Sequence, residues 1–170
     1  MLRKIFALSA VISLAGCSST LTKEQSTYVD SLSPCEKVQG LLDSFESGFE
    51  PLKAVRVQNN FSDVWTPKYH VIGNSCQIIA FNNNHISYKC AQTYDQESQS
   101  RENFEWAIDK VASCLGETWQ REDINQNESQ RVTFHNDTHK AEISIQSGRT
   151  LAKYHKTWQT SFEVGDLMKN

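Results

Sequence analysis

The sequence predicts an α+β fold in which two helices pack on one face of an antiparallel sheet, forming a two-layer sandwich. Apolar residues recur at helical spacing in two segments, 35–49 and 101–115, and with a period of two in the segments that follow each of them. The layout is therefore helix, strands, helix, strands. An internal duplication of an α-β-β-β unit, with halves at 34–94 and 101–164, is left as an alternative, although the two halves share almost no residue identity.

The first helix begins at Ser33, where Ser33-Pro34-Cys35-Glu36 forms a capping box with proline at the first helical position. Gly48 and Pro51 end the helical pattern. One face of this helix is apolar and consists of Cys35, Val38, Leu41, Leu42, Phe45 and Phe49. Residues 52–64 have a less regular pattern, for which we expect a loop with a short strand.

The strands of the first half are predicted at 68–72, 76–81 and 85–94. Asn82-Asn83-Asn84 separates the last two, and asparagine tolerates the positive φ that a hairpin turn needs. One face of this hairpin carries Cys76, Ile78, Ala80, Ile86, Tyr88 and Cys90. The other face is mainly polar but includes Ile79 and Phe81.

The second helix is predicted over 101–115, with Ser98 or Ser100 as its N-cap and Gly116 as its end. Four strands follow, at 117–122, 130–135, 140–146 and 156–164, with a hairpin turn at Asn136-Asp137. Their apolar and polar side chains alternate, as in antiparallel sheets with one face in water. The apolar side consists of Val132, Phe134, Ala141, Ile143, Ile145, Trp158, Phe162 and Val164.

The N-terminus has the pattern of an export signal. Arg3 and Lys4 precede an apolar run over 5–14, which is too short to span a bilayer as a helix. Leu14-Ala15-Gly16-Cys17 follows directly and resembles the lipobox of bacterial lipoproteins. The resemblance implies cleavage after Gly16, diacylglycerol on the Cys17 sulfur and acylation of the new amino group.

The same resemblance predicts the location of the protein. Residue 18 is serine, whereas an aspartate there resembles the retention signal for the inner membrane. We therefore expect an outer-membrane lipoprotein whose domain faces the periplasm. The expected division is a cleaved signal at 1–16, the lipidated cysteine and a flexible tether at 17–32, and one α+β domain at 33–170.

The cysteines predict two disulfide bonds. The chain has five cysteines, and assigning Cys17 to lipid leaves four, an even number in an oxidising compartment. One connectivity pairs Cys76 with Cys90 across the hairpin and Cys35 with Cys114 between the helices. The other joins each helix cysteine to one hairpin cysteine. The hairpin register slightly favours the first, and the absence of a Cys-x-x-Cys pair argues against a zinc site.

The charge and the motifs of the sequence argue against nucleic-acid binding, metal binding and catalysis. The net charge of −3 becomes −5 once Arg3 and Lys4 are removed, and the chain has no basic run, so nucleic acid is not expected as a partner. His135 and His139 flank a turn, where we expect solvated side chains and no metal site. No nucleophile elbow and no glycine-rich phosphate loop occur in the sequence, so we expect no catalytic residues and no cofactor.

The function that the sequence favours is protein–protein contact. Trp106 lies off the apolar stripe of its helix, and Ile79 with Phe81 lies on the open face of the sheet, so these three side chains are the candidate partner surface. The hypothesis is a non-catalytic interaction module of the envelope, such as an assembly accessory, a pilot, or an inhibitor or immunity protein. The alternative is a binding module for a small envelope ligand, such as a lipid or a peptidoglycan fragment.

Overall fold

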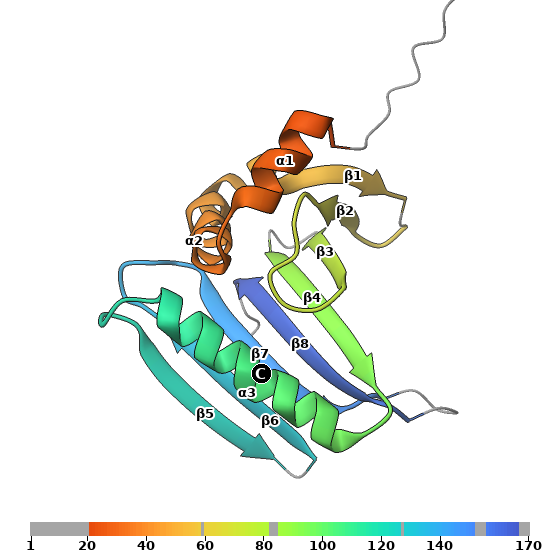
Figure 1. Cartoon of the computed structure of the whole chain (residues 1–170), viewed down its shortest axis with the longest axis vertical. Coiled ribbons are helices and arrows are strands. Elements are labelled where there is room, and N and C mark those ends of the chain that lie inside the picture. The colour runs from red at the N-terminus through yellow and green to blue at the C-terminus, as the bar shows by residue number, and fades with distance from the viewer. Residues whose placement is uncertain (1–20, 59, 82–84, 127, 152–155, 167–170) are drawn as a thin grey trace, which may run out of the picture.

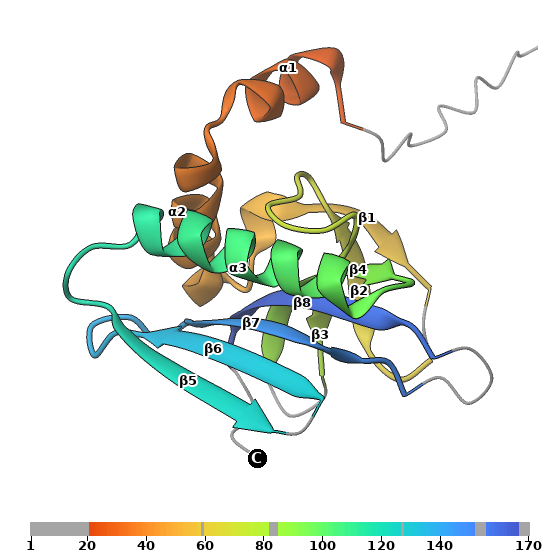
Figure 2. The same cartoon turned by 60° about the horizontal axis from the view of Figure 1, so that its bottom comes forward.

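The computed structural model describes residues 21–58, 60–81, 85–126, 128–151 and 156–166. These residues form one eight-stranded antiparallel sheet, in the order β1-β2-β3-β4-β8-β7-β6-β5, with helices on one side of it (Figures 1 and 2). The elements are α1 Lys23–Ser31, α2 Pro34–Ser44, η1 Phe45–Ser47, η2 Glu50–Leu52, β1 Lys53–Val57, β2 Asp63–Pro67, β3 Ser75–Ala80, β4 Ile86–Tyr94, α3 Glu97–Cys114, β5 Gln120–Gln126, β6 Ser129–His135, β7 Glu142–Arg149 and β8 Trp158–Gly165.

The predicted fold, two helices on one face of a sheet, is wrong. The described part of the chain has three α-helices and a sheet that dominates the molecule. Only α3 lies along the sheet, whereas α2 lies across one end of it and α1 lies beyond α2 (Figures 1 and 2). Where a loop with a short strand was predicted, the structure has the two strands β1 and β2, whose burial does not alternate from residue to residue.

Each half of the chain consists of one helix followed by a four-stranded meander. The first half therefore has one strand more than the three predicted for it, and the second half has the predicted four. The meander β1–β4 follows α2, and the meander β5–β8 follows α3. The two meanders join where β4 pairs with β8 over eight residue pairs, from Ser87↔Gly165 to Tyr94↔Trp158. The first and last strands of the described sheet are therefore β1 and β5, the opening strands of the two meanders.

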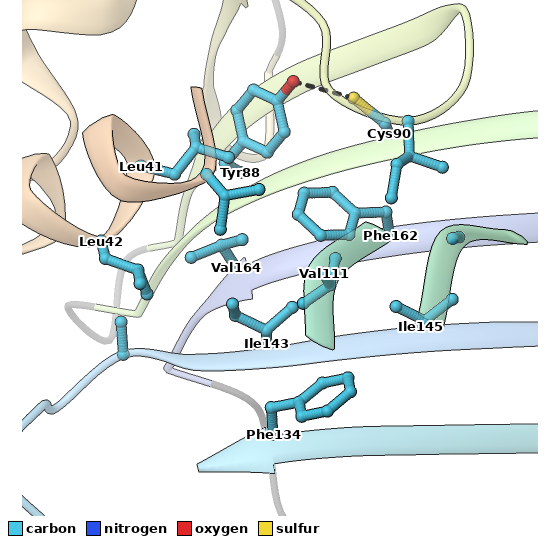
Figure 3. Close-up of a cluster of buried hydrophobic side chains, with 14 of the residues drawn as sticks. Leu41, Leu42, Tyr88, Cys90, Val111, Phe134, Ile143, Ile145, Phe162 and Val164 are labelled. Atoms are coloured by element: carbon cyan, nitrogen blue, oxygen red, sulfur yellow. Dashed lines mark hydrogen bonds between the residues drawn. The ribbon is translucent and has the colours of Figure 1, made fainter. Parts of the chain in front are cut away.

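The core lies between the sheet and the helices and uses the apolar residues that alternation predicted. Tyr88, Phe162 and Val164 are fully buried, and Figure 3 shows them beside Leu41 of α2 and Val111 of α3. Burying one large apolar side chain stabilises a fold by about 1.5–3 kcal/mol. The described β-sheet and the two helices α2 and α3 therefore share one continuous core.

The caps of the two core helices differ. The predicted capping box at α2 is confirmed, since the Ser33 hydroxyl accepts a hydrogen bond from the Glu36 amide and the Glu36 carboxylate accepts one from the Ser33 amide. These bonds lower the pKa of Glu36. The predicted caps of α3, Ser98 and Ser100, are wrong because the helix begins at Glu97 and its N-cap, Gln96, makes no side-chain bond.

The segment 68–72 was predicted as a strand but is an irregular loop between β2 and β3. Its apolar residues Tyr69 and Ile72 turn into the core, where they are 7% and 4% exposed. The Tyr69 hydroxyl donates a hydrogen bond of 3.0 Å to the Lys37 carbonyl oxygen of α2. These two buried residues are three positions apart, whereas one face of a strand repeats every two residues, so the loop buries its apolar side chains without a strand.

The segment 17–32, predicted as the lipidated cysteine and a tether, contains a helix where the structure describes it. Residues 23–31 form α1, which begins with a second capping box between Thr22 and Gln25. Val29 and Leu32 pack against the edge of the core. Sequence analysis missed α1 because its apolar residues are too few to mark a helical stripe. Residues 17–20 lie outside the described residues.

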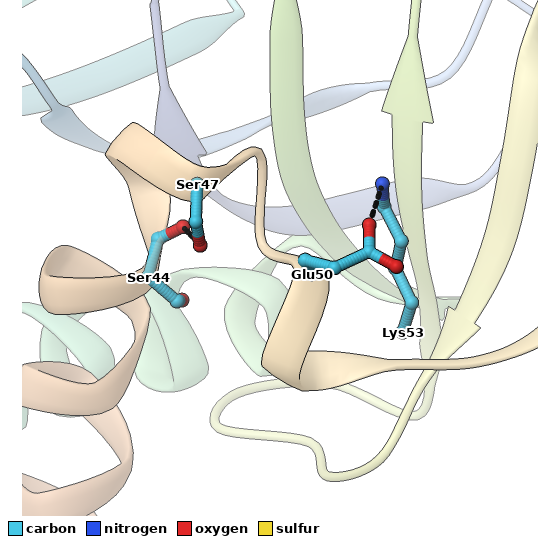
Figure 4. A network of polar contacts seen from close by, with 4 residues as sticks. All are labelled: Ser44, Ser47, Glu50 and Lys53. Carbon is cyan, nitrogen blue, oxygen red and sulfur yellow. Dashed lines mark hydrogen bonds and ion pairs between the residues drawn. The ribbon is translucent and has the colours of Figure 1, made fainter.

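The chain reverses between α2 and β1 through two short 3-10 helices. Gly48 and Phe49 both adopt positive φ, 66° and 57°, and Phe49 is fully buried. The Ser47 hydroxyl donates to the Ser44 carbonyl oxygen, and Lys53 pairs with Glu50 at 2.9 Å (Figure 4). This reversal leads the chain from the end of the helical segment, near the predicted stop at Gly48, to β1 at the edge of the sheet.

Two disulfide bonds join the predicted cysteine pairs. Cys76 and Cys90 face each other in the register of β3 and β4, with a Cα–Cα distance of 4.0 Å. Cys35 at the start of α2 is bonded to Cys114 at the end of α3, with a Cα–Cα distance of 4.9 Å. The first of the two predicted connectivities is therefore confirmed. The predicted turn at 82–84 lies outside the described residues.

Candidate functional site

The candidate site is a groove on the face of the sheet opposite α3. Side chains of the central strands alternate between the two faces, so the neighbours of the core residues point to this open face. The groove has a volume of about 250 Å³ and is lined by side chains from β3, β4, β6, β7 and β8. It therefore crosses the junction between the two halves.

The floor of the groove consists of small side chains. Ser144 on β7, Ser161 on β8 and Ser87 on β4 line it, and Gly165 lies next to Ser87 in the register. A Cβ atom at Gly165 would come within 2.5 Å of the Ile86 carbonyl oxygen, so glycine is required there. On β4 and β8, these short side chains alternate with the longer Lys89 and Glu163, which are paired at 3.6 Å.

One border of the groove is apolar. Ile79 and Phe81 line it from β3 and from the residue after β3. Ile79 is paired with Val64, which is paired in turn with Val57, so an apolar row continues across β2 and β1 on the same face. Phe81 is 42% and Val57 is 38% exposed. This border can accept an apolar side chain from another molecule.

The other border is polar and cationic. The half-buried Arg131 of β6 donates a hydrogen bond of 3.2 Å to the Gln146 side-chain oxygen. Two other basic side chains of the groove already have carboxylate partners, since Lys89 lies 3.6 Å from Glu163 and His85 lies 2.8 Å from Asp166. Among the described residues, no carboxylate lies within ion-pair distance of Arg131.

The structure separates the three residues of the predicted partner surface. Ile79 and Phe81 lie together at the groove. Trp106 is 47% exposed on α3 and is therefore on the helix side of the sheet, away from the groove. Sequence reasoning missed Arg131 and the serine floor. Alternation places Arg131 on the open face, but only the pairing of β6 with β7 shows that Gln146 lies beside it.

The histidines around the 136–137 turn have contacts of their own. The His139 ring stacks on Trp119 at 5.4 Å, and the His135 Nε2 atom lies 3.2 Å from the Gln120 side-chain oxygen. Asn136 caps the turn by accepting hydrogen bonds from Thr138. Within the described ranges, no group of three or more histidine, cysteine or acidic residues is placed to hold a metal ion.

A second cavity lies between α1 and α2. It has a volume of about 570 Å³, and its apolar lining comes from Tyr28, Val29, Leu32, Leu52 and Tyr69. Burial raises the pKa of Tyr69 to about 12, with smaller contributions from Tyr28 and Asp43. The size falls within the range of small-ligand pockets, 300–1,000 Å³. This cavity bears on the alternative function, the binding of a small envelope ligand.

No protein-family model matches the chain, and no curated protein matches it in sequence. In the part of the chain that the structure describes, no helix is long and apolar enough to cross a membrane.

Proposed function

We propose that the chain is an outer-membrane lipoprotein whose domain faces the periplasm and acts as a non-catalytic protein-interaction module. The observation that carries the proposal is the open sheet face, where Ile79 and Phe81 border a groove with a small-residue floor. Exposed apolar side chains next to paired charges are typical of surfaces that bind other proteins. Envelope assembly accessories, pilots and inhibitor or immunity proteins belong to this class.

Two further features support the location. The lipobox Leu14-Ala15-Gly16-Cys17 follows the apolar run directly, and two acyl chains are already enough for stable anchoring. The disulfide bonds Cys35–Cys114 and Cys76–Cys90 suit an oxidising compartment such as the periplasm.

The anchor is tested with two variants at neighbouring positions. Cys17→Ala should release the protein from membranes or leave its signal uncleaved, because the lipid has no attachment point. Ser18→Asp should keep the lipid but shift the protein to inner-membrane fractions. Fractionation of the envelope with antibody detection gives both results. A Cys17→Ala protein that fractionates with the outer membrane like the wild type contradicts the anchor.

The interaction surface is tested by site-specific photo-cross-linking in the native envelope. Benzoylphenylalanine at position 81 should give one defined adduct, because Phe81 borders the groove. The same probe at position 106 is the matched control, since Trp106 has similar exposure on the other side of the sheet. Ile79→Asp should abolish the adduct at position 81. An adduct at 106 alone, or an adduct at 81 that Ile79→Asp leaves unchanged, contradicts the groove as the binding surface.

The cavity between α1 and α2 supports the second candidate function, binding of a small apolar ligand such as an acyl chain. Its volume is about 570 Å³, enough for a ligand of that class. The fluorescent fatty acid cis-parinaric acid should bind to the protein, and Val29→Glu should abolish the signal by placing a charge in the cavity. A protein that does not enhance the probe's fluorescence would contradict this second function.

A further inference from the structure

The side chain in the groove with the clearest implication for a ligand is Arg131. The Gln146 side-chain nitrogen donates a hydrogen bond of 2.9 Å to the Ser129 hydroxyl. The Gln146 side-chain oxygen is therefore turned toward Arg131 and accepts a hydrogen bond of 3.2 Å from its guanidinium. This contact orients the guanidinium but leaves its charge uncompensated. Arginine presents several N–H donors in a planar fork that matches a carboxylate in a bidentate contact. Arg131 is therefore oriented for an anion that the described residues do not supply.

The rest of the groove limits where that anion would come from. Lys89 and His85 have carboxylate partners inside the groove, Glu163 and Asp166. A ligand with many negative charges would meet these two carboxylates. A ligand with one carboxylate at Arg131 and neutral chemistry elsewhere avoids them. The charges of the groove thus favour a single carboxylate at one end and an apolar group at the Ile79 and Phe81 end.

The distance between the two ends sets the length of the ligand. Arg131 lies on β6 and Ile79 on β3, and the path between them crosses β7, β8 and β4. Four strand spacings of about 4.8 Å give about 19 Å across the sheet. In the register, the row of Ile79 meets β7 at Glu142 and the row of Arg131 meets it at Gln146, which adds about 13 Å along the strands. The separation is therefore about 23 Å, which an extended peptide advancing about 3.3 Å per residue covers in about seven residues. The serine floor between the ends offers hydroxyl groups to the peptide backbone.

We propose that this groove binds an extended peptide segment of a partner protein, lying across the strands, with a carboxylate on Arg131 and a large apolar side chain on Ile79 and Phe81. The two groups are about seven residues apart. The inference rests on the proposed protein-binding function and names the chemistry of its partner. The carboxylate belongs either to an aspartate or glutamate side chain or to the end of the partner chain, and the test distinguishes these sources.

The probes are two random dodecapeptide libraries, one with blocked and one with free C-termini, selected on the immobilised domain. Peptides from the blocked library should carry Asp or Glu about seven residues from Phe, Leu or Trp. Enrichment confined to the free library, with the apolar residue about seven positions from the end, assigns the carboxylate to the chain terminus. Enriched peptides that lack the pair, or no enrichment above the bare support, overturn the proposal.

Variants of the domain then locate the contact. Arg131→Gln should weaken binding of an enriched peptide at least about tenfold, because a charge-assisted contact is lost, and Phe81→Ser should weaken it as well. Arg121→Gln is the matched control, since Arg121 is paired with Asp123 on β5 and shares the core side of the sheet with its register partner Phe134. Melting curves check that each variant is folded.

The outcomes separate this inference from the function on which it rests. Equal affinity of Arg131→Gln and Arg121→Gln for the peptide overturns the role of Arg131. If the photo-cross-link at Phe81 nevertheless forms in the envelope, protein binding at the groove stands and only the carboxylate is wrong. If neither assay detects binding at the groove, the proposed function itself fails.

Discussion

The two halves of the domain have the same plan but are stabilised differently. In the second half, the 18-residue α3 lies along the sheet and buries Phe104, Ile108 and Val111 against it. In the first half, α2 has only 11 residues and lies across the end of the sheet (Figure 2). Its meander β1–β4 is therefore less covered by helix than the meander β5–β8.

The two halves also differ in the contacts that stabilise their strands. The first half contains the Cys76–Cys90 disulfide between its last two strands, β3 and β4, with both cysteines buried. The second half contains no cysteine in its described strands, and α3 is held to them by a buried cluster of hydroxyl groups. The Ser100 hydroxyl lies 2.8 Å from that of Ser147 and 3.0 Å from that of Thr160. A covalent bond stabilises one half, and helix packing stabilises the other.

The largest expected effect concerns the bond that joins the halves. Cys35–Cys114 closes a sequence separation of 79 residues, and a loop of this length implies a contribution of about 4 kcal/mol. The double variant Cys35→Ala with Cys114→Ala should lower the free energy of unfolding by about that amount in urea titrations. A loss under about 1 kcal/mol would show that packing alone holds the halves together.

The next effect tests how much the short helix contributes to the first half. Leu41 of α2 is fully buried against the core, so Leu41→Ala should cost about 3 kcal/mol through lost burial and a cavity. Leu151→Ala is the matched control, because Leu151 is fully exposed. Thermal and urea unfolding measure both. If the two variants have equal stability, α2 is not part of the cooperative core.

A smaller effect is expected at the hydroxyl cluster of the second half. Ser100→Ala removes the buried hydroxyl that bonds to Ser147 and Thr160. Ser147 loses this partner, whereas Thr160 still donates to the Ser100 carbonyl oxygen, so the change should cost about 1–2 kcal/mol. Ser113→Ala serves as control, because Ser113 is exposed on the same helix and bonds only locally, to the Lys110 carbonyl oxygen and the neighbouring Cys114. Equal unfolding midpoints for the two variants would show that apolar packing alone positions α3.

The smallest effect appears only at high pH and belongs to the first half. Burial raises the pKa of Tyr69 to about 12, whereas an unfolded chain loses the phenolic proton near pH 10. The folded state then binds more protons, so the free energy of unfolding should fall as pH rises from about 10 to 12. Unfolding of wild type and Tyr69→Phe at pH 9 and 11 measures this fall. An equal fall in both proteins would exclude Tyr69 as its source.

Several parts of the fold follow from local patterns. The start of α2 at Ser33 was predictable because a capping box is encoded in four consecutive residues. The pairing of Cys76 with Cys90 was favoured by their equal distance from the centre of the hairpin. The core residues of β4, β6, β7 and β8 followed from alternation, since side chains of a strand point to opposite faces in turn.

The predictions that failed concern segments whose structure depends on distant contacts. Residues 68–72 were predicted as a strand, but Tyr69 bonds to Lys37 of α2 and the segment becomes a loop. Serine is a residue type favoured at helix N-caps, but the Ser100 hydroxyl is hydrogen-bonded to Ser147 and Thr160 inside the core. In both cases a partner more than 30 residues away decides the outcome, and no local pattern contains it.

The sequence by itself determined the export and lipidation hypothesis, the strand and helix character of most segments, and the apolar residues of the core, because these depend on neighbours in the chain. Only the tertiary structure decided the candidate site. Ile79 and Arg131 are 52 positions apart in the sequence, and they border one groove because β4 pairs with β8 and joins the two meanders. Which strands become neighbours is set by packing of the whole sheet, so the groove has no signature in either half alone.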